Sequence, residues 1–267
     1  MEFENLLPSD ILKPYIKYYW VCTTDEDVSK EIMYPTGCLE FCIDISGGNT
    51  VRHFGDRAAT MPRLEVLGHI TQPTTATVTK GTTVLVTRFY PYAMPLFFPD
   101  QASSFTNSSI DLYDILSMDS TEFYNLIIGQ PLIDQKIKAL ETFLVQRLIK
   151  SDKKRDQFKL MEGLCRHIYK VDTFRIENLA ACCGFSERYI QKLFLDWVGL
   201  TPKSLHSVLR FNKGLELIQS SGCSLTSIAH ECGYYDQAHF IQDFKQFTGY
   251  TPNAYFSGEA GEVFYAP

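Results

Sequence analysis

The stretch that decides the fold of the C-terminal half is ENLAACCGFSERYIQKLF, residues 177–194. It predicts a short helix over 177–183 that ends at Gly184, because glycine readily adopts the left-handed conformation that terminates helices. Ser186 is a good N-cap for a second helix. The apolar face expected for that second helix comprises Tyr189, Ile190, Leu193, Phe194 and Trp197.

The second helix carries another face that has no apolar role. Arg188, Gln191, Lys192 and Leu195 follow one another at i, i+3, i+4 and i+7, which places them together on one side of the helix. A helix, a tight glycine turn and a second helix with a donor-rich face form a helix-turn-helix arrangement. Many helical hairpins share this pattern, so one copy is weak evidence for DNA binding.

The chain repeats the plan about 50 residues further on, where LTSIAHECGYYDQAHF (225–240) matches IENLAACCGFSERYIQ (176–191). The second copy has one additional residue between its glycine and its cap. The matched positions are Ala180 with Ala229, Gly184 with Gly233, and Ser186 with Asp236. A Gly-x-Thr-Pro sequence follows each copy, at 199–202 and 249–252, and a capping Thr before Pro favours a helix start. The helix after Thr201 is long enough to bridge the two units.

This doubled pattern resembles the AraC/XylS family of bacterial transcription regulators over residues 155–256, most specifically in CGYYDQAHFIQDFKQFTGYTPNAYF (232–256). In that family two helix-turn-helix units share a linker helix and insert their second helices into successive major grooves. The resemblance implies a transcription regulator, an activator or a repressor, that binds double-stranded DNA and contacts RNA polymerase. Matching positions would place the DNA contacts at Ser186, Arg188, Gln191, Lys192, Gln237, Ala238, His239 and Gln242, with Lys245 near phosphate.

The second unit departs from the family pattern. Gln242 stands where many members carry Arg, and Asp243 follows it. Arg suits guanine whereas Gln suits adenine, so the second half-site is expected to tolerate A·T pairs. The tail over 258–267 is longer than the pattern needs, and its acidic residues would repel DNA; no function is assigned to it.

The net charge of −6 does not exclude DNA as a partner. Residues 1–150 carry 12 Lys and Arg against 18 Asp and Glu, whereas residues 151–267 carry 13 against 13. The acidic excess therefore belongs to the N-terminal half, and DNA binding depends on the local distribution of charge.

The first hundred residues predict strands, and the period becomes helical from about Asp111. YIKYYWVCTT, CLEFCIDIS and ATVTKGTTVLVTRFYP are β-branched and aromatic runs separated by PTG, SGGN and QPT. The predicted fold is α+β, with an antiparallel barrel and helices at 1–150 and an all-α domain with two helix-turn-helix units at 151–257. The polar run KSDKKRD (150–156) is the expected linker.

A helix over DQKIKALETFLVQRLIK carries one apolar stripe. This stripe indicates either a helix that covers the barrel or the seam of a homodimer, and both interpretations can hold together. The stripe comprises Ile133, Ile137, Leu140, Leu144 and Leu148.

The family resemblance implies that the N-terminal half is a cupin-like domain that senses a small-molecule effector and dimerises. Such a barrel would hold an apolar, aromatic pocket with a few polar groups. Each candidate lining residue has an equally ordinary structural interpretation. The candidates are Trp20, Tyr34, His69, Arg88 and Tyr90.

Three alternatives for the N-terminal half have weaker support. A metal-dependent cupin enzyme needs a His cluster with a carboxylate, but this half contains just His53 and His69, without His-x-His spacing. A metal-responsive regulator has no CxxC pair to use. A thiol-responsive regulator could use Cys38 and Cys42, which face the same way on one strand, but no basic residue adjoins them to lower a thiol pKa. Neither an enzyme nor a resident metal or cofactor is predicted.

Cellular location follows from the remaining patterns. No apolar run approaches the roughly 20 residues that span a bilayer, and the acidic start MEFENLLPSD does not resemble a signal peptide. The eight cysteines fit a reducing compartment as small buried hydrophobes. A cytoplasmic protein without membrane contact is expected.

Overall fold

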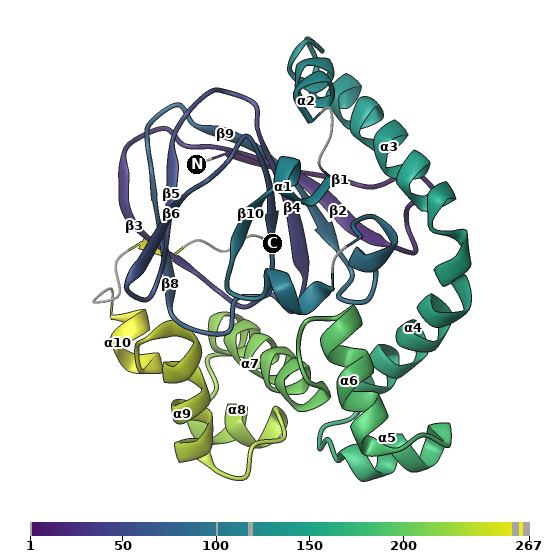
Figure 1. Ribbon diagram of the computed structural model, residues 1–267. Coiled ribbons are helices and arrows are strands. Elements are labelled where there is room, and N and C mark those ends of the chain that lie inside the picture. The colour runs from purple at the N-terminus through teal and green to yellow at the C-terminus, as the bar shows by residue number, and fades with distance from the viewer. Residues whose placement is uncertain (1, 100, 117–119, 258–261, 264–267) are drawn as a thin grey trace.

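The computed structural model describes residues 2–99, 101–116, 120–257 and 262–263 (Figure 1). Strands fill the N-terminal part and helices the C-terminal part. The strands are β1 (Glu2–Leu6), β2 (Ile16–Thr23), β3 (Val28–Met33), β4 (Leu39–Asp44), β5 (Thr50–Phe54), β6 (Arg57–Thr60), β7 (Leu64–Leu67), β8 (Thr74–Val78), β9 (Thr83–Phe89), β10 (Ser109–Asp111) and β11 (Glu262–Val263). The mixed α+β fold predicted from the sequence is confirmed.

The strands form two sheets, with orders β1-β2-β9-β4-β7-β10 and β11-β3-β8-β5-β6. Neighbouring strands are antiparallel except β11 and β3, which pair in parallel. The closed barrel that the sequence predicted does not appear among the described strands. Both β2 and β4 pair with β9, whereas β3 and β5 pair with β8, so the chain alternates between two open ladders (Figure 1).

Both faces of the larger sheet are buried. Successive side chains along its strands point alternately into the main hydrophobic core and into the space between the two sheets. On β4, Leu39, Phe41 and Ile43 join the main hydrophobic core, whereas Glu40 and Cys42 face the space between the sheets. The same alternation on β2 and β9 explains why these strands contain almost no exposed residue.

Helices cover the outer face of this sheet and continue into the C-terminal part. They are α1 (Leu112–Leu116), α2 (Ser120–Ile128), α3 (Ile133–Lys150), α4 (Arg155–Lys170), α5 (Ile176–Cys183), α6 (Glu187–Trp197), α7 (Pro202–Ser221), α8 (Leu225–Glu231), α9 (Gln237–Thr248) and α10 (Pro252–Phe256). Short 3₁₀ turns are η1 (Met94–Leu96), η2 (Ala102–Phe105) and η3 (Asp152–Lys154).

The stripe on α3 packs against its own chain. Ile137, Leu140 and Leu144 are buried in the main core, and Ile133 and Leu148 are half-buried against it. The covering interpretation is therefore confirmed, and the stripe cannot also be a free dimer seam, because those side chains are already enclosed.

The polar run at 150–156 is helical. Between α3 and α4 lies just the single turn η3, so the two helices follow one another down one side of the molecule (Figure 1). Lys154 Nζ donates to the carbonyl oxygen of Pro95 at 2.6 Å, which fastens this turn to the N-terminal part. The expected linker is thus a rigid connection.

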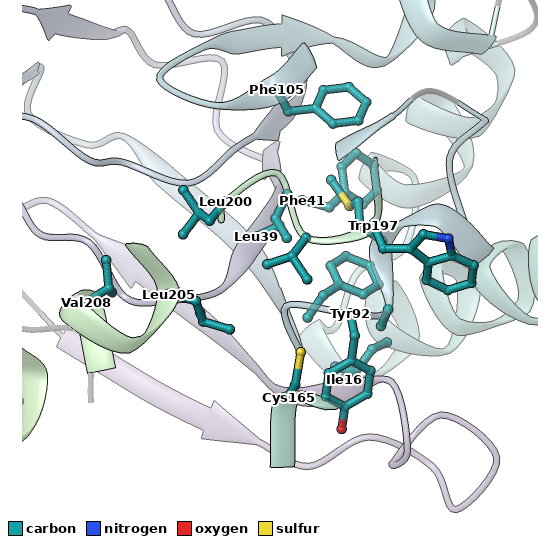
Figure 2. Close-up of a cluster of buried hydrophobic side chains, with 14 of the residues drawn as sticks. Ile16, Leu39, Phe41, Tyr92, Phe105, Cys165, Trp197, Leu200, Leu205 and Val208 are labelled. Atoms are coloured by element: carbon teal, nitrogen blue, oxygen red, sulfur yellow. The ribbon is translucent and has the colours of Figure 1, made fainter. Parts of the chain in front are cut away.

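One hydrophobic core runs through both halves of the chain. Leu39 and Phe41 of the larger sheet share it with Trp197 and Leu200, which lie at the end of α6 and just after it, and with Val208 of α7 (Figure 2). Gly199 illustrates how close the approach is: at φ 83° its Cα would place a Cβ 2.7 Å from the carbonyl oxygen of Ala102. The C-terminal helices are therefore docked on the sheets rather than tethered to them.

Among the described residues, no helix is long and apolar enough to cross a membrane. The described part of the tail, β11, pairs beside β3, with Glu262 opposite Glu31 and Val263 opposite Ile32. The other residues of the tail segment 258–267 lie outside the described residues.

Candidate DNA-binding surface and ligand cavity

The first helix-turn-helix unit is built as its sequence predicts. Gly184 ends α5 at φ 69°, and Ser186 Oγ accepts a hydrogen bond from the Tyr189 amide at 3.2 Å to cap α6. Ile190, Leu193, Phe194 and Trp197 bury the inner face of α6. This burial fixes which face of the helix turns outward.

The outward face of α6 is the donor-rich one. Ser186, Arg188, Gln191 and Lys192 are all exposed, as predicted. One assignment is wrong: Tyr189 was placed on the apolar face, but it is 44% exposed and its ring packs on Phe185, with ring centroids 5.0 Å apart. This aromatic pair widens the outward face next to Arg188.

The second unit repeats the capping with different residues. Gly233 has φ 73°, and a Cβ there would meet the Asp172 carbonyl oxygen at 2.4 Å, so glycine is required. Asp236 Oδ1 accepts from the His239 amide at 2.8 Å and caps α9. Phe240, Phe244 and Phe247 bury the inner face of the helix.

The predicted contacts of α9 divide into two groups. Ala238, Gln242 and Lys245 are exposed, whereas Gln237 and His239 are half-buried. Gln237 Oε1 accepts from the Thr226 hydroxyl of α8 at 2.7 Å. The His239 ring meets Tyr234 edge-on at 5.3 Å, and its Nε2 lies 3.4 Å from Arg210 of α7.

Arg210 braces the second recognition helix from inside. Its Nη2 donates to Asp243 Oδ2 at 2.7 Å, and its guanidinium carbon lies 3.7 Å from the centroid of the Tyr234 ring. The paired side chains are just 12% and 14% exposed. Asp243 thus has an internal partner, so it does not stand as a free negative charge towards DNA.

The helix α7 joins the two units, as the sequence predicted. Thr201 caps it by accepting from the Ser204 amide, and Pro202 occupies its first turn. Figure 1 shows the units on either side of α7, at the end of the molecule away from the sheets. Thr251 and Pro252 start α10 in the same way.

A cavity of about 620 Å³ lies between the two sheets and reaches α7. Trp20, Tyr34 and Arg88 line it, as predicted. His69 and Tyr90 do not line it. Asn212, Leu215 and Glu216 of α7 close one side.

His69 lies instead behind the first unit. It is 2% exposed, and its ring lies near the backbone of Val198, just after α6. Burial lowers the pKa of His69 to about 3, so the ring is neutral at pH 7.

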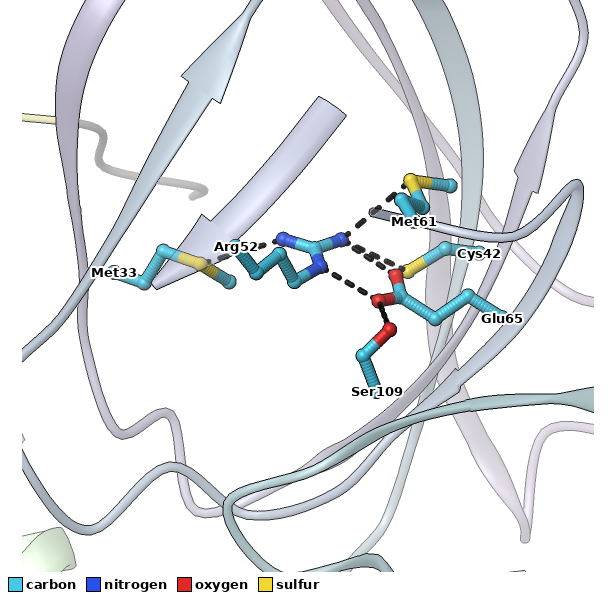
Figure 3. A network of polar contacts seen from close by, with 6 residues as sticks. All are labelled: Met33, Cys42, Arg52, Met61, Glu65 and Ser109. Carbon is cyan, nitrogen blue, oxygen red and sulfur yellow. Dashed lines mark hydrogen bonds and ion pairs between the residues drawn. The ribbon is translucent and has the colours of Figure 1, made fainter. Parts of the chain in front are cut away.

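The sequence interpretation missed a buried ion pair in the cavity wall (Figure 3). Arg52 Nε and Nη2 donate to Glu65 at 2.7 and 2.6 Å, and Ser109 Oγ donates to the same carboxylate. Burial alone would lower the pKa of Arg52, but Glu65 raises it above its ordinary value. The signal was present in TVRHF and LEVL, where each charge interrupts an otherwise apolar strand face.

A second ion pair lies on the larger sheet, where Arg88 of β9 and Glu40 of β4 are cross-strand partners. Arg88 donates to Glu40 Oε1 from Nε at 2.9 Å and from Nη2 at 2.6 Å, and its Nη1 also contacts the Tyr18 hydroxyl. Burial and the charge of Glu40 act in opposite directions on Arg88, and the net result is a raised pKa.

Two of the cavity thiols, Cys22 and Cys42, are poor candidates for a redox response. Burial, together with Glu31, raises the pKa of Cys22 to about 12, and burial with Glu65 raises that of Cys42. Reactive cysteines need the thiolate form. Within the described residues, no group of three or more His, Cys, Asp or Glu side chains is placed to hold a metal.

Comparisons with known proteins assign the C-terminal part. A family model described as a helix-turn-helix domain matches residues 179–258, and one described as a domain of unknown function, DUF6597, matches residues 4–111. The chain is 28% identical over 148 residues to the uncharacterized HTH-type transcriptional regulator YidL of Escherichia coli, covering 53% of this chain and 50% of YidL. It is 23% identical over 145 residues to the raffinose operon regulatory protein RafR of Pediococcus pentosaceus, covering 54% and 52%.

The chain spans about half the length of these curated relatives in the matches. Among solved structures, ToxT from Vibrio cholerae is similar over 96% of this chain and 98% of its own, with 11% identity and a TM-score of 0.48.

Proposed function

We propose that this chain, which belongs to the AraC/XylS family of transcription regulators, binds a specific double-stranded DNA site with α6 and α9 in successive major grooves. The observation that carries the proposal is the pair of capped helix-turn-helix units joined by the single helix α7, each with an outward polar face. Successive major grooves on one side of DNA are about 34 Å apart, so one chain can contact two of them.

Roles within the two faces differ. Arg188 and Gln191 have donors and acceptors suited to base edges, whereas Lys192 and Lys245 suit phosphates. In the second unit Gln242 is the exposed base-reading residue. His239 contacts DNA only with the part of its ring that Tyr234 and Arg210 leave uncovered.

Binding-site selection with the purified full-length chain and random DNA tests this proposal. We expect two half-sites about 10 base pairs apart, the second richer in A·T pairs. Gln242→Ala should relax the preference at one position of the second half-site and cost roughly 1–3 kcal/mol there. Equal losses on selected and random DNA would contradict the assignment of Gln242.

We further propose that the cavity between the sheets is an effector site that controls the regulator. Its position supports this, because Asn212, Leu215 and Glu216 of α7 form part of its wall. A ligand there would contact the helix that sets the spacing of the two units. Contact with RNA polymerase, activation of transcription and a cytoplasmic location remain part of the proposal on family grounds.

A homodimer through the N-terminal half also remains a proposal, with a different seam from the buried stripe of α3. Leu126, Ile128 and Leu132 are 52%, 39% and 60% exposed around the connection from α2 to α3. Sedimentation should show a dimer for the parent chain and a folded monomer for Leu126→Lys with Leu132→Lys. Ile149→Lys, at the other end of α3, is the control, and a monomeric parent chain at micromolar concentration would end this proposal.

A further inference from the structure

The wall of the cavity is aromatic and sulfur-rich. Tyr18, Trp20 and Tyr34 contribute rings from and beside the larger and smaller sheets, and Met33 and Met61 contribute thioethers. Rings favour stacked or edge-on contact with other rings, and thioethers are polarisable groups that pack well against aromatic edges. These walls suit a planar aromatic body.

The cations that line the cavity are already engaged. Arg52 is bound in two places by Glu65, and Arg88 by Glu40 (Figure 3 shows the first pair). The third cation, Lys17, holds its ammonium 5.7 Å from the centroid of the Tyr90 ring. An anionic ligand would have to displace a built-in carboxylate to reach either arginine, and Glu31 adds a further carboxylate to the wall.

A cationic ligand gains little from Glu40 and Glu65 for the same reason. It would approach two guanidinium groups whose carboxylate partners already have charged hydrogen bonds at 2.6–2.9 Å. Burying an unpaired charge of either sign is costly, whereas an uncharged ring loses little on leaving water.

We infer that the cavity takes an uncharged ligand with a planar aromatic body. This inference rests on the proposed effector function of the same cavity. The half-buried Asn212 amide of α7 can donate to or accept from one polar substituent on such a ligand, which couples the bound molecule directly to the helix between the two DNA-reading units.

Two fluorescent probes with one ring system test the inference. N-phenyl-1-naphthylamine is uncharged at neutral pH, and 8-anilino-1-naphthalenesulfonate carries the same rings with an added sulfonate. The full-length chain should bind the uncharged probe saturably, with one probe per chain, and the sulfonate about tenfold or more weakly. Equal or tighter binding of the sulfonate, or no saturable binding of the uncharged probe, would overturn the inference.

Two variants locate the probe and test the charge argument. Ala76→Phe fills the cavity from β8 and should abolish binding of the uncharged probe. Glu40→Gln leaves Arg88 with an uncompensated charge, so the sulfonate should gain about tenfold in affinity. The control is the same exchange at the exposed Glu26, and thermal unfolding checks that each variant is folded.

The outcomes separate the inference from the proposed function. If neither variant alters probe binding, the probes bind elsewhere and the inference fails. DNA binding by the same preparations, measured by gel shift on the selected site, reports independently on the regulator, and a change in that affinity on adding the uncharged probe reports on the effector function.

Discussion

The two helix-turn-helix units share a local design but differ in what holds their recognition helices. In both, a left-handed glycine ends the first helix and a side-chain cap starts the second. The outward face of α6 is open, and the helix is anchored at its rear end, where Thr106 Oγ1 donates to the Gly199 carbonyl at 2.9 Å. The helix α9 is braced along its length by Arg210.

This difference indicates a division of labour. The first unit offers two exposed cations, Arg188 and Lys192, whereas the second offers Gln242 and Lys245 on a helix held by Arg210. The second unit contacts the N-terminal half through the residues that follow α9: Tyr250 accepts from Lys30 at 2.8 Å, and Tyr255 meets Tyr34. The second unit is thus connected to the cavity wall through Tyr34.

Replacing Arg210, which braces α9, should produce the largest change in free energy. We expect Arg210→Met to reduce the free energy of unfolding by about 3–5 kcal/mol, because Asp243 would remain enclosed without its partner. Adding Asp243→Leu should recover much of the loss, since an apolar pair leaves no buried charge. Urea unfolding measures both, with Arg188→Met as the outward-facing control. A loss below about 1 kcal/mol would show that α9 needs no brace.

Replacing Arg188 on the outward face of α6 should produce the next largest change, here in the free energy of DNA binding. Arg188→Ala should weaken binding to the selected site by about 2 kcal/mol, because a bidentate contact with guanine is lost. Arg166→Ala, on the exposed side of α4, controls for the loss of one positive charge. Gel shifts on selected DNA measure both. Should Gln242→Ala cost more than Arg188→Ala, the braced helix would be the dominant reader.

Local signals in the sequence predicted the two units well, because each signal is short. Gly184, Ser186, Asp236 and the Thr-Pro starts act within one turn of helix, where the backbone alone decides the outcome. Tyr189 was misplaced for a related reason: its partner Phe185 lies four positions earlier, before the cap, and holds the ring on the outward side.

Long-range partners could not be predicted in the same way. The stripe on α3 has the same spacing whether it covers its own sheet or a second chain. Only the three-dimensional fold shows that Leu140 and Leu144 are enclosed. Arg52 and Glu65 lie on strands that do not pair with each other, so no register argument brings them together. Arg88 and Glu40 differ from that pair, because they lie opposite each other on the paired strands β9 and β4; Arg88 was predicted to line the cavity, but its engagement by Glu40 needs the register of those strands, which the sequence alone does not give.

Acidification from pH 7 to pH 5 should lower the free energy of unfolding by about 2 kcal/mol, through the buried ring of His69 behind the first unit. Because burial lowers the pKa of His69 to about 3, the unfolded chain binds the proton more readily than the folded one. The stabilisation is complete above about pH 6.5 and declines as the pH falls toward 3, by up to about 1.4 kcal/mol per pH unit. His206, whose pKa burial also lowers, adds to the same slope.

Urea unfolding between about pH 7 and pH 5 measures this slope. His69→Asn should make it shallower, whereas His230→Asn, at an exposed position of α8, should leave it unchanged. If His69→Asn leaves the slope unchanged, protonation of His69 does not affect the free energy of unfolding. The two units would then differ only in their outward faces.

The smallest expected effect concerns Lys245, near the end of α9. Its exposed ammonium is placed to meet a phosphate, and a phosphate contact carries no sequence information. Lys245→Ala should therefore weaken selected and random DNA alike, by roughly 0.5–1 kcal/mol, and make the dependence of log affinity on log salt shallower by about 0.9. Lys192→Ala is the matched test in the first unit, since Lys192 is the exposed lysine of the open helix. Gel shifts at several salt concentrations separate the two lysines. If Lys192→Ala changes sequence preference while Lys245→Ala does not, the open helix reads bases with both of its cations, and the difference between the units is sharper than their shared fold implies.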